Sequence, residues 1–252
     1  MRIEFLYRYP VKGLTAEALE EATLSPGGPI PWDRAFALAQ GDAGFDPEQP
    51  RWLPKHNFMC LMKNATIARL SASFDPRTGE LVLRSAGRPA FSANALTAGG
   101  RERIGVYLSE FLGAEARGTP RFHYVPGHVF CDQRQPVVSF INLATLTDFE
   151  SRVGVPRERI RFRANIYFRG ASPWSELSWV GKELQVGGAR LSVLRRIPRC
   201  PATEVNPATG IRDADPVSEL IALNGHRDLG IHAEVTGGGT IAVGDAIEVI
   251  DG

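Results

Sequence analysis

Residues 160–168 read Ile-Arg-Phe-Arg-Ala-Asn-Ile-Tyr-Phe, an unbroken alternation of apolar and polar residues. A period of two predicts a β-strand with one buried face, so this stretch predicts a fold built on a sheet. The opposite face would carry Arg161, Arg163, Asn165 and Tyr167. Two guanidinium groups and an amide on one face suit a phosphate and the edge of a heterocycle, because arginine is planar, permanently charged and bidentate. The alternative is a solvated outer face without a ligand.

Patterns on both sides of this stretch add further strands and a few helices. Strands are predicted over residues 3–9, 34–39, 66–74 and 80–84, and the chain is predicted to fold back at glycine-containing turns within 183–197 and 239–250. Helical spacing of apolar residues predicts helices over residues 104–112, 143–153 and 216–222. The sequence therefore predicts a mostly β fold with a few helices (α+β), barrel-like and in two domains. The glycine pair in Ala98-Gly99-Gly100 is typical of a break between structural units, so we predict a domain boundary there, with domains at residues 1–98 and 99–252.

Composition and charge exclude several classes of protein. The 252 residues are enough to bury a core without disulfides, and a net charge of +1 gives no general attraction to nucleic acid or anionic lipid, so we expect neither as a partner. Cys60, Cys131 and Cys200 form no CxxC pair, which fits a reducing compartment, and three thiolates are too few for an all-cysteine iron–sulfur cluster. Charges at Arg2 and Glu4 argue against a signal peptide, and no apolar run approaches the roughly 20 residues of a membrane helix, so we expect a cytoplasmic protein.

The segment around Cys200 carries the strongest chemical signal. Residues 195–200 read Arg-Arg-Ile-Pro-Arg-Cys, and three arginines just before a cysteine would favour its thiolate, the form that attacks and binds metal. No histidine or cysteine stands at metal-binding spacing from Cys200, which argues against zinc. The alternative is a buried structural cysteine, as we expect for Cys60 and Cys131.

Two further patterns are weaker. Tyr-Pro-Val-Lys-Gly at 9–13 ends the first strand in a turn that would present Lys12 and backbone N–H groups to a phosphate, although it lacks the GxxxxGK pattern. Asp33-Arg34 precedes an apolar strand and fits either a surface ion pair or a site. The five histidines lack HxxxH and HxxEH spacing, so no zinc hydrolase is expected.

Taken together, these motifs resemble one known family. Tyr-Pro-Val-Lys at 9–12, Asp-Arg at 33–34, Phe-Arg-Ala-Asn at 162–165 and Arg-Cys-x-x-Thr-x-Val-Asn-Pro-x-Thr-Gly at 199–210 occur in the order seen in MOSC proteins, followed by Gly-Thr-Ile-x-Val-Gly-Asp at 239–245. The chain resembles the branch in which a MOSC N-terminal β-barrel domain precedes the MOSC domain, as in the mitochondrial amidoxime reducing component and bacterial relatives. The resemblance spans nearly all of the chain.

The resemblance implies a molybdenum cofactor, a pterin dithiolene with a phosphate tail, whose metal is bound by Cys200. A thiolate suits this role because it is a soft, deprotonated ligand. Lys12 and Arg34 match positions that hold the phosphate end, while Arg163, Asn165 and Asp132 match positions that contact the pterin. His232 falls where some relatives have a tyrosine beside the metal. The candidate cofactor-binding residues are therefore Lys12, Gly13, Arg34, Asp132, Arg163, Asn165, Arg199 and His232.

The chain departs from the family pattern at several positions. Phe-Arg-Pro-Asn of the family is Phe-Arg-Ala-Asn at 162–165, which keeps both polar residues. Gly13 and Pro198 stand where serines are common, so two hydroxyl contacts are missing. Residues 45–62 match the mitochondrial proteins poorly. If this segment forms a wall of the substrate cleft, the substrate differs.

The resemblance implies a two-electron reductase that removes oxygen from an N-hydroxylated, N-oxide or S-oxide compound. Since three cysteines cannot build a ferredoxin module, we expect electrons to come from a separate reductase or iron–sulfur protein. The alternative is a protein that binds and carries the cofactor or its sulfur without turnover, related to the C-terminal domains of cofactor sulfurases. Sulfurase activity itself is not expected, because it depends on a pyridoxal-phosphate domain that this sequence lacks.

Overall fold

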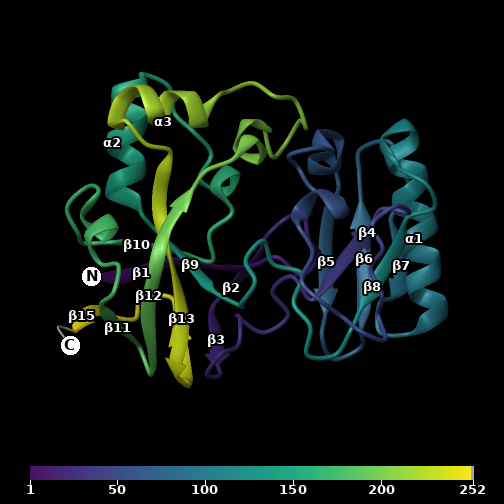
Figure 1. The fold of residues 1–252 in the computed structure, drawn as a ribbon, viewed down its shortest axis with the longest axis horizontal. Coiled ribbons are helices and arrows are strands. Elements are labelled where there is room, and N and C mark those ends of the chain that lie inside the picture. The colour runs from purple at the N-terminus through teal and green to yellow at the C-terminus, as the bar shows by residue number, and fades with distance from the viewer. Residues whose placement is uncertain (251–252) are drawn as a thin grey trace.

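Strand β1 (Arg2–Arg8) starts the fold and ends before Pro10, which has no N–H to extend a ladder. In the computed structural model, which describes residues 1–250, β1 lies inside an eight-stranded sheet (Figure 1). The strands of this sheet, in spatial order, are β15 (Ile247–Ile250), β11 (Glu183–Val186), β12 (Ala189–Pro198), β13 (Asp228–Gly237), β9 (Val138–Asn142), β10 (Ile166–Arg169), β1 and β2 (Glu17–Leu19). Neighbours pair antiparallel except β9 and β10, which are parallel.

The remaining strands form three smaller sheets. They are the pair β14 (Gly239–Ala242) and β3 (Glu21–Leu24), the pair β4 (Phe36–Ala39) and β8 (Arg121–Tyr124), and the three strands β5 (Ser71–Asp75), β6 (Glu80–Arg84) and β7 (Phe91–Asn94). We call β4 to β8 and their helix the small lobe, and the eight-stranded sheet with β3, β14 and the other two helices the large lobe. The mostly β fold with a few helices is therefore confirmed.

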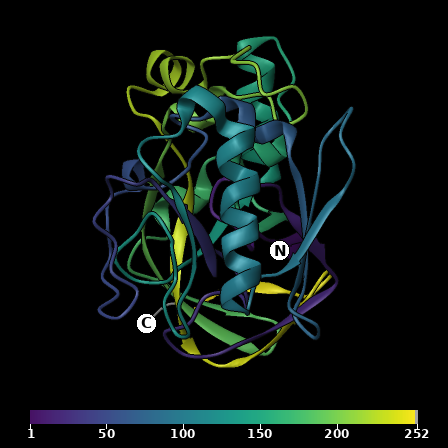
Figure 2. The same ribbon diagram turned by 90° about the vertical axis from the view of Figure 1, so that its right-hand side faces the viewer.

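Three α-helices flank the sheets, and each begins behind a capping side chain. Thr97, Asn142 and Asp215 accept a hydrogen bond from the first turn of α1 (Ala98–Leu112), α2 (Leu143–Val153) and α3 (Pro216–Asn224), and a glycine with positive φ ends each helix. Figure 2 shows α1 along the outer face of the small lobe, where it packs on β7 and β8. Helix α2 crosses from β9 to its parallel neighbour β10 and contacts both strands. The helices predicted from the sequence are all present.

Separate apolar cores stabilise the two lobes. The large sheet is covered on one face by a cluster that includes Phe140, Ile166 and Val193, and a second cluster packs Phe149 of α2 and Leu220 of α3 against it. The small lobe has its own core of aliphatic and aromatic residues, among them Phe36, Phe74 and Phe122. The chain enters the small lobe after β3 and leaves it after β8, and the division at residues 98 and 99 stays a prediction.

Three predictions of local structure were wrong in part. Residues 65–69 form a 3-10 helix, and strand β5 begins only at Ser71. The turn near Gly244 exists, but β14 and β15 pair with β3 and β11 rather than with each other, because each strand completes a different sheet. Residues 159–162 form a 3-10 helix, so the alternating stretch that begins at Ile160 becomes a strand only from Ile166 onward.

None of the helices in residues 1–250 combines the length and the apolar character that crossing a bilayer requires.

Candidate functional site

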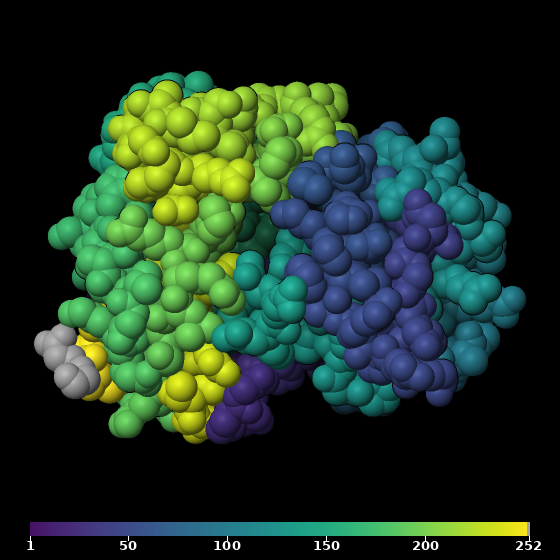
Figure 3. All heavy atoms as spheres, in the orientation of Figure 1, coloured from purple at the N-terminus to yellow at the C-terminus, as the bar shows by residue number. Residues whose placement is uncertain are grey.

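A cavity of about 510 Å³ lies between the two lobes, where Figure 3 shows a hollow in the surface. Its walls come from the segments that follow β1, β4, β8 and β12, and from the large sheet itself. Every candidate site residue chosen from the sequence lines it: Lys12, Gly13, Arg34, Asp132, Arg163, Asn165, Arg199, Cys200 and His232. The tertiary structure thus gathers residues that are up to 220 positions apart, from Lys12 to His232, around a volume that suits a small ligand.

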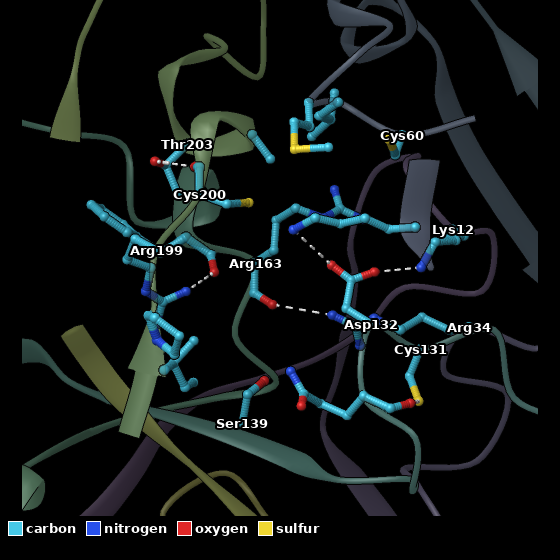
Figure 4. A pocket seen from close by; sticks show the side chains of 18 of the residues that line it. Lys12, Arg34, Cys60, Cys131, Asp132, Ser139, Arg163, Arg199, Cys200 and Thr203 are labelled. Atoms are coloured by element: carbon cyan, nitrogen blue, oxygen red, sulfur yellow. Dashed lines mark hydrogen bonds and ion pairs between the residues drawn. The ribbon is translucent and has the colours of Figure 1, made fainter. Parts of the chain in front are cut away.

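Cys200 presents a free thiol to this cavity (Figure 4). It follows directly on β12, and its carbonyl oxygen accepts hydrogen bonds from the backbone N–H and the hydroxyl of Thr203, at 3.0 and 2.9 Å. These bonds close a tight turn at Pro201, which fixes the direction of the side chain. The structure therefore excludes the alternative of a cysteine buried in hydrocarbon.

The other two cysteines also line the cavity but are more constrained. Burial raises the pKa of both the Cys60 and the Cys131 thiol, so each favours the neutral form. The Cys131 thiol donates a hydrogen bond to the Gln133 carbonyl at 2.9 Å. Among the residues described, no three His, Cys, Asp or Glu side chains come together as a metal site.

Lys12, which is buried, and Arg34, which is partly buried, line the cavity as cations with acidic partners. The Lys12 ammonium group donates to the Phe130 carbonyl at 2.8 Å and pairs with Asp132. Arg34 pairs with Asp33, whose other oxygen accepts the Tyr9 N–H at 2.7 Å. Asp33 is 2% exposed, which excludes the solvated surface pair considered from the sequence. Both cations are thus held in place before any ligand binds.

Arg163 and Asn165 reach the cavity from an irregular segment rather than from one face of a strand. Arg163 has a left-handed backbone (φ 53°) after the 3-10 helix Arg159–Phe162, and it donates to the Leu14 carbonyl at 2.8 Å. The Asn165 amide is fully engaged in the scaffold, since its oxygen accepts from the Ser139 N–H and hydroxyl and its nitrogen donates to the Tyr7 carbonyl. Asn165 therefore fixes the wall, while Arg163 presents charge to the cavity.

The remaining polar residues of the predicted strand face do not act together. Arg161 is buried and bonded to Glu158, to Asp213 and to the Glu204 carbonyl, so it ties two loops at the edge of the cavity. Tyr167 lies inside the large lobe, fully buried, and its hydroxyl donates to the Arg159 carbonyl at 2.5 Å. The expectation of four polar groups on one strand face was wrong, because the left-handed turn at Arg163 rotates the chain before the strand begins.

Only one of the three arginines before Cys200 approaches it. Arg199 is buried, donates to the carbonyls of Phe162 and Leu229, and burial lowers its pKa to about 10. Arg196 is exposed and donates to the Leu177 carbonyl, and neither it nor Arg195 lines the cavity. The prediction that all three arginines act on the thiol was wrong. Arg196 points to the exposed face of β12, and Arg195 lies opposite His232 on β13 rather than beside Cys200.

Lys55 is the cation beside Cys200 that sequence reasoning missed. Burial alone would lower its pKa, but the charges of Asp132 and Cys200 and a hydrogen bond with the Cys200 side chain raise it. Its ammonium nitrogen lies 3.6 Å from Asp132 Oδ2. Lys55 belongs to the aperiodic segment 41–57, 145 positions before Cys200, so no spacing or motif pointed to it. The segment 45–62 does form a wall of the cavity, through Trp52, Pro54, Lys55, His56, Cys60, Leu61 and Met62.

The electrostatics of the cavity keep its ionisable groups in defined states. Burial would raise the pKa of the Asp132 carboxyl, but Lys12 and Lys55 lower it well below its ordinary value. Burial and the charges of Arg199 and Arg195 lower the pKa of His232 to about 3, so its imidazole is neutral at physiological pH. His232 Nδ1 is buried and has no hydrogen-bond partner within residues 1–250. An unpaired buried nitrogen of this kind is costly unless a ligand satisfies it.

Comparison with known sequences accounts for both halves of the chain. Residues 1–115 match the MOSC N-terminal beta barrel domain, and residues 121–248 match the MOSC domain. Over 116 residues the chain is 29% identical to mitochondrial amidoxime reducing component 2 of Macaca fascicularis, which covers 41% of this chain and 34% of that protein. Over 84 residues it is 32% identical to mitochondrial amidoxime reducing component 2 of Bos taurus, which covers 33% of this chain and 24% of that protein. The matched parts thus span well under half of these relatives.

Solved structures give more distant matches. The YuaD protein from Bacillus subtilis matches with 17% identity and a TM-score of 0.46 over 98% of this chain and 94% of its own. YiiM from Geobacillus stearothermophilus matches with 17% identity and a TM-score of 0.36 over 45% of this chain and 54% of its own. The MOSC match alone covers more than half of the 252 residues, and the chain belongs to the MOSC-domain proteins, in the branch with a MOSC N-terminal β-barrel domain.

Proposed function

We propose that this protein is a molybdenum-cofactor-dependent reductase that removes oxygen from N-hydroxylated, N-oxide or S-oxide compounds, with Cys200 as the protein ligand of the metal. The observation that carries the proposal is the position of the Cys200 thiol. It opens into a cavity whose opposite walls hold Lys12, Arg34 and Arg163. The MOSC match and the partial similarity to amidoxime reducing components support a function related to the molybdenum cofactor.

The residues present fit such a cofactor. A group that brings its own sulfur ligands needs few from the protein, which agrees with a cavity that offers the free Cys200 side chain and no cluster of metal ligands among residues 1–250. Lys12 and Arg34 would hold the phosphate end, because Lys12 is buried, Arg34 is partly buried, and both are held by acidic partners. His232 Nδ1 is buried without a hydrogen-bond partner, so a ligand atom that bonds to it would remove the cost of leaving it unpaired.

The chain's own part in the reaction is binding, orientation and exclusion of water. When bound, the cofactor would supply a metal centre that exchanges an oxygen atom and two electrons with small molecules. Cys200 would anchor the metal, Arg163 would hold the pterin by charge-assisted hydrogen bonds, and Asn165 would keep that wall rigid. Neutral His232 would offer a single hydrogen bond without adding charge beside the metal. We propose that electrons come from a separate reductase or iron–sulfur protein.

Elemental analysis of the purified protein tests the proposal first. We expect stoichiometric molybdenum and reduction of benzamidoxime or a sulfoxide by a reduced viologen dye. Cys200→Ser should lose most of the metal with little change in melting temperature, because the side chain is not part of a core. Cys131→Ser is the matched control and should keep the metal.

The other outcomes separate the alternatives. Bound molybdenum with no turnover on a broad panel of substrates would indicate a cofactor carrier instead of a reductase. Full metal content in Cys200→Ser would overturn the assignment of the ligand. Turnover with NADH alone would contradict the need for a separate electron donor.

A further inference from the structure

Positively charged side chains outnumber negatively charged ones among the residues that line the cavity. The cations are Lys12, Arg34, Lys55, Arg161, Arg163, Arg199 and Arg227, and the only carboxylate among the lining residues is Asp132. A cavity whose lining side chains carry mostly one sign of charge, within protein of low dielectric, attracts ligands of the opposite charge. Which of the cations remain available for a substrate depends on their partners.

Most of these cations already have ion-pair or hydrogen-bond partners within the protein. Lys12 is paired with Asp132 and Arg34 with Asp33, while Arg161 holds Glu158 and Asp213. Arg199 and Arg163 donate to backbone carbonyls. Lys12, Arg34 and Arg163 are also the residues that we assign to the cofactor. This leaves Lys55 and Arg227 for any further ligand.

Lys55 is incompletely neutralised. Its side chain is 28% exposed, and its contact with Asp132 is a long one of 3.6 Å, since Lys12 takes the other oxygen of that carboxylate. Lys55 lines the same cavity as the Cys200 thiol. If Cys200 binds a metal as we propose, Asp132 is the one ion-pair partner that the described residues give Lys55.

Arg227 stands on the large lobe next to the same thiol. Its carbonyl oxygen accepts the backbone N–H of Arg199 at 2.9 Å, so Arg227 is fixed beside the residue before Cys200. The residue is exposed, and its guanidinium group has no hydrogen bond, ion pair or ring contact within residues 1–250. An arginine at the mouth of a binding cavity with all its donors free suits a planar carboxylate.

Apolar side chains line the same cavity as these cations. They are Trp52, Pro54, Leu61, Met62 and Ile197, and the Arg134 guanidinium carbon lies 5.2 Å from the centroid of the Trp52 ring. The cavity thus combines apolar lining with one incompletely neutralised cation, Lys55, and one unpaired cation, Arg227. This pattern suits an apolar body with an acidic substituent.

We infer that the substrate carries a carboxylate, which Lys55 and Arg227 bind while the N-oxygenated or S-oxide group faces Cys200. The inference deepens the proposed function and rests on it. It makes Lys55 and Arg227 residues that determine specificity through contact with the substrate. Neither lies in a motif shared with the family, which agrees with a substrate-specific role for the segment 45–62.

A pair of substrates that differ by one carboxylate tests the inference on the molybdenum-loaded protein. Benzamidoxime and its 4-carboxy derivative are reduced with viologen as donor, and kcat/KM is measured for wild type, Lys55→Gln and Arg227→Gln. We expect wild type to prefer the carboxylate by about tenfold or more, the scale of one charge-assisted hydrogen bond. Each variant should lose most of that preference through KM for the carboxylate substrate, and in Arg227→Gln kcat/KM for benzamidoxime should stay within about twofold.

Lys63→Gln is the matched control, because Lys63 is an exposed lysine of the next turn that does not line the cavity. It should keep the wild-type preference. A binding experiment without turnover provides an independent readout. Calorimetry should show 4-carbamoylbenzoate binding at least about tenfold more tightly than benzamide to wild type, with the difference lost in Lys55→Gln.

The outcomes distinguish failure of the inference from failure of the proposed function. Equal kcat/KM for both substrates, or an equal loss of kcat for both in Lys55→Gln, would overturn the carboxylate site while leaving the reductase in place. If neither substrate is reduced, the proposed function fails, and calorimetry still decides whether Lys55 and Arg227 bind a carboxylate. Binding of 4-carbamoylbenzoate unchanged in both variants would overturn the site in either case.

Discussion

Arg34 and Arg163 are 129 positions apart in the sequence, yet both direct their guanidinium groups at the ring of Tyr9, at 5.0 and 4.4 Å from its centroid. Both residues also have a left-handed backbone with φ of 53°. A residue other than glycine in this conformation costs about 1 to 2 kcal/mol. Strain at two cations of one cavity is typical of a binding site, where the surrounding structure holds side chains in position for a ligand.

The two arginines make cofactor content sensitive to a single substitution. Arg163→Ala removes the charge on the pterin side, and we expect molybdenum content to fall at least about tenfold, since a charge-assisted hydrogen bond contributes about 1.5 to 3 kcal/mol. Arg169→Ala is the control, because Arg169 is exposed on β10 and pairs with Glu4 away from the cavity. Metal analysis of both variants checks this, and normal content in Arg163→Ala would remove Arg163 from the site.

Asp33 stabilises the same corner of the fold. Asp33→Ala leaves Arg34 without its ionic partner and the Tyr9 N–H without its acceptor, so we expect the free energy of unfolding to drop by about 3 kcal/mol. Asp42→Ala breaks a pair whose side chains are 59% and 40% exposed, and it should cost less than about 1 kcal/mol. Urea unfolding measures both. Equal effects of the two substitutions would contradict a buried role for Asp33.

His232 makes stability depend on pH. The folded protein keeps its imidazole neutral down to a pKa of about 3, whereas the unfolded chain takes up a proton near the ordinary value of 6.5. The unfolded state therefore binds more protons between these values, and stability falls as the pH decreases. From pH 7 to pH 5 this group should lower the free energy of unfolding by about 2 kcal/mol.

The substitution His232→Gln removes this titration. Urea unfolding at pH 7 and pH 5 should show a smaller loss of stability in the variant than in wild type, by about 2 kcal/mol. If wild type and variant lose stability equally between pH 7 and pH 5, the His232 imidazole takes up its proton as readily in the folded protein as in the unfolded chain.

Arg212 connects the two lobes over the cavity. Its guanidinium group donates to the Leu61 and Met62 carbonyls on one side, and to the Pro201 carbonyl and the Glu204 carboxylate on the other. Arg212→Ala should increase amide hydrogen exchange in both loops and lower the free energy of unfolding by only about 1 kcal/mol, because the side chain is partly exposed. Unchanged exchange in residues 60–64 would show that other contacts hold the lobes together.

Short-range patterns in the sequence were reliable where local chemistry decides the conformation. Helix α2 spans the predicted residues 143–153, because a capping Asn142 and a terminating Gly154 enclose an apolar stripe. The turn at 75–79 joins β5 and β6 as predicted, through proline and glycine at the positions that a turn requires. The strand predicted from the alternation at 160–168 was wrong in part, since residues 159–162 form a 3-10 helix and Arg163 takes a left-handed backbone before the strand begins.

The sequence by itself determined the residue types of the site and their family order, because the Cys200 thiol, the Asp33 and Asp132 carboxylates and several arginines are fixed by the amino acids at those positions. Only the tertiary structure decided which cations face Cys200. Arg195 and Arg196 are close to Cys200 in sequence but do not line the cavity, whereas Arg199 does. Lys55, 145 positions away, reaches Cys200 because the two lobes close around one cavity, a long-range arrangement that no local pattern encodes.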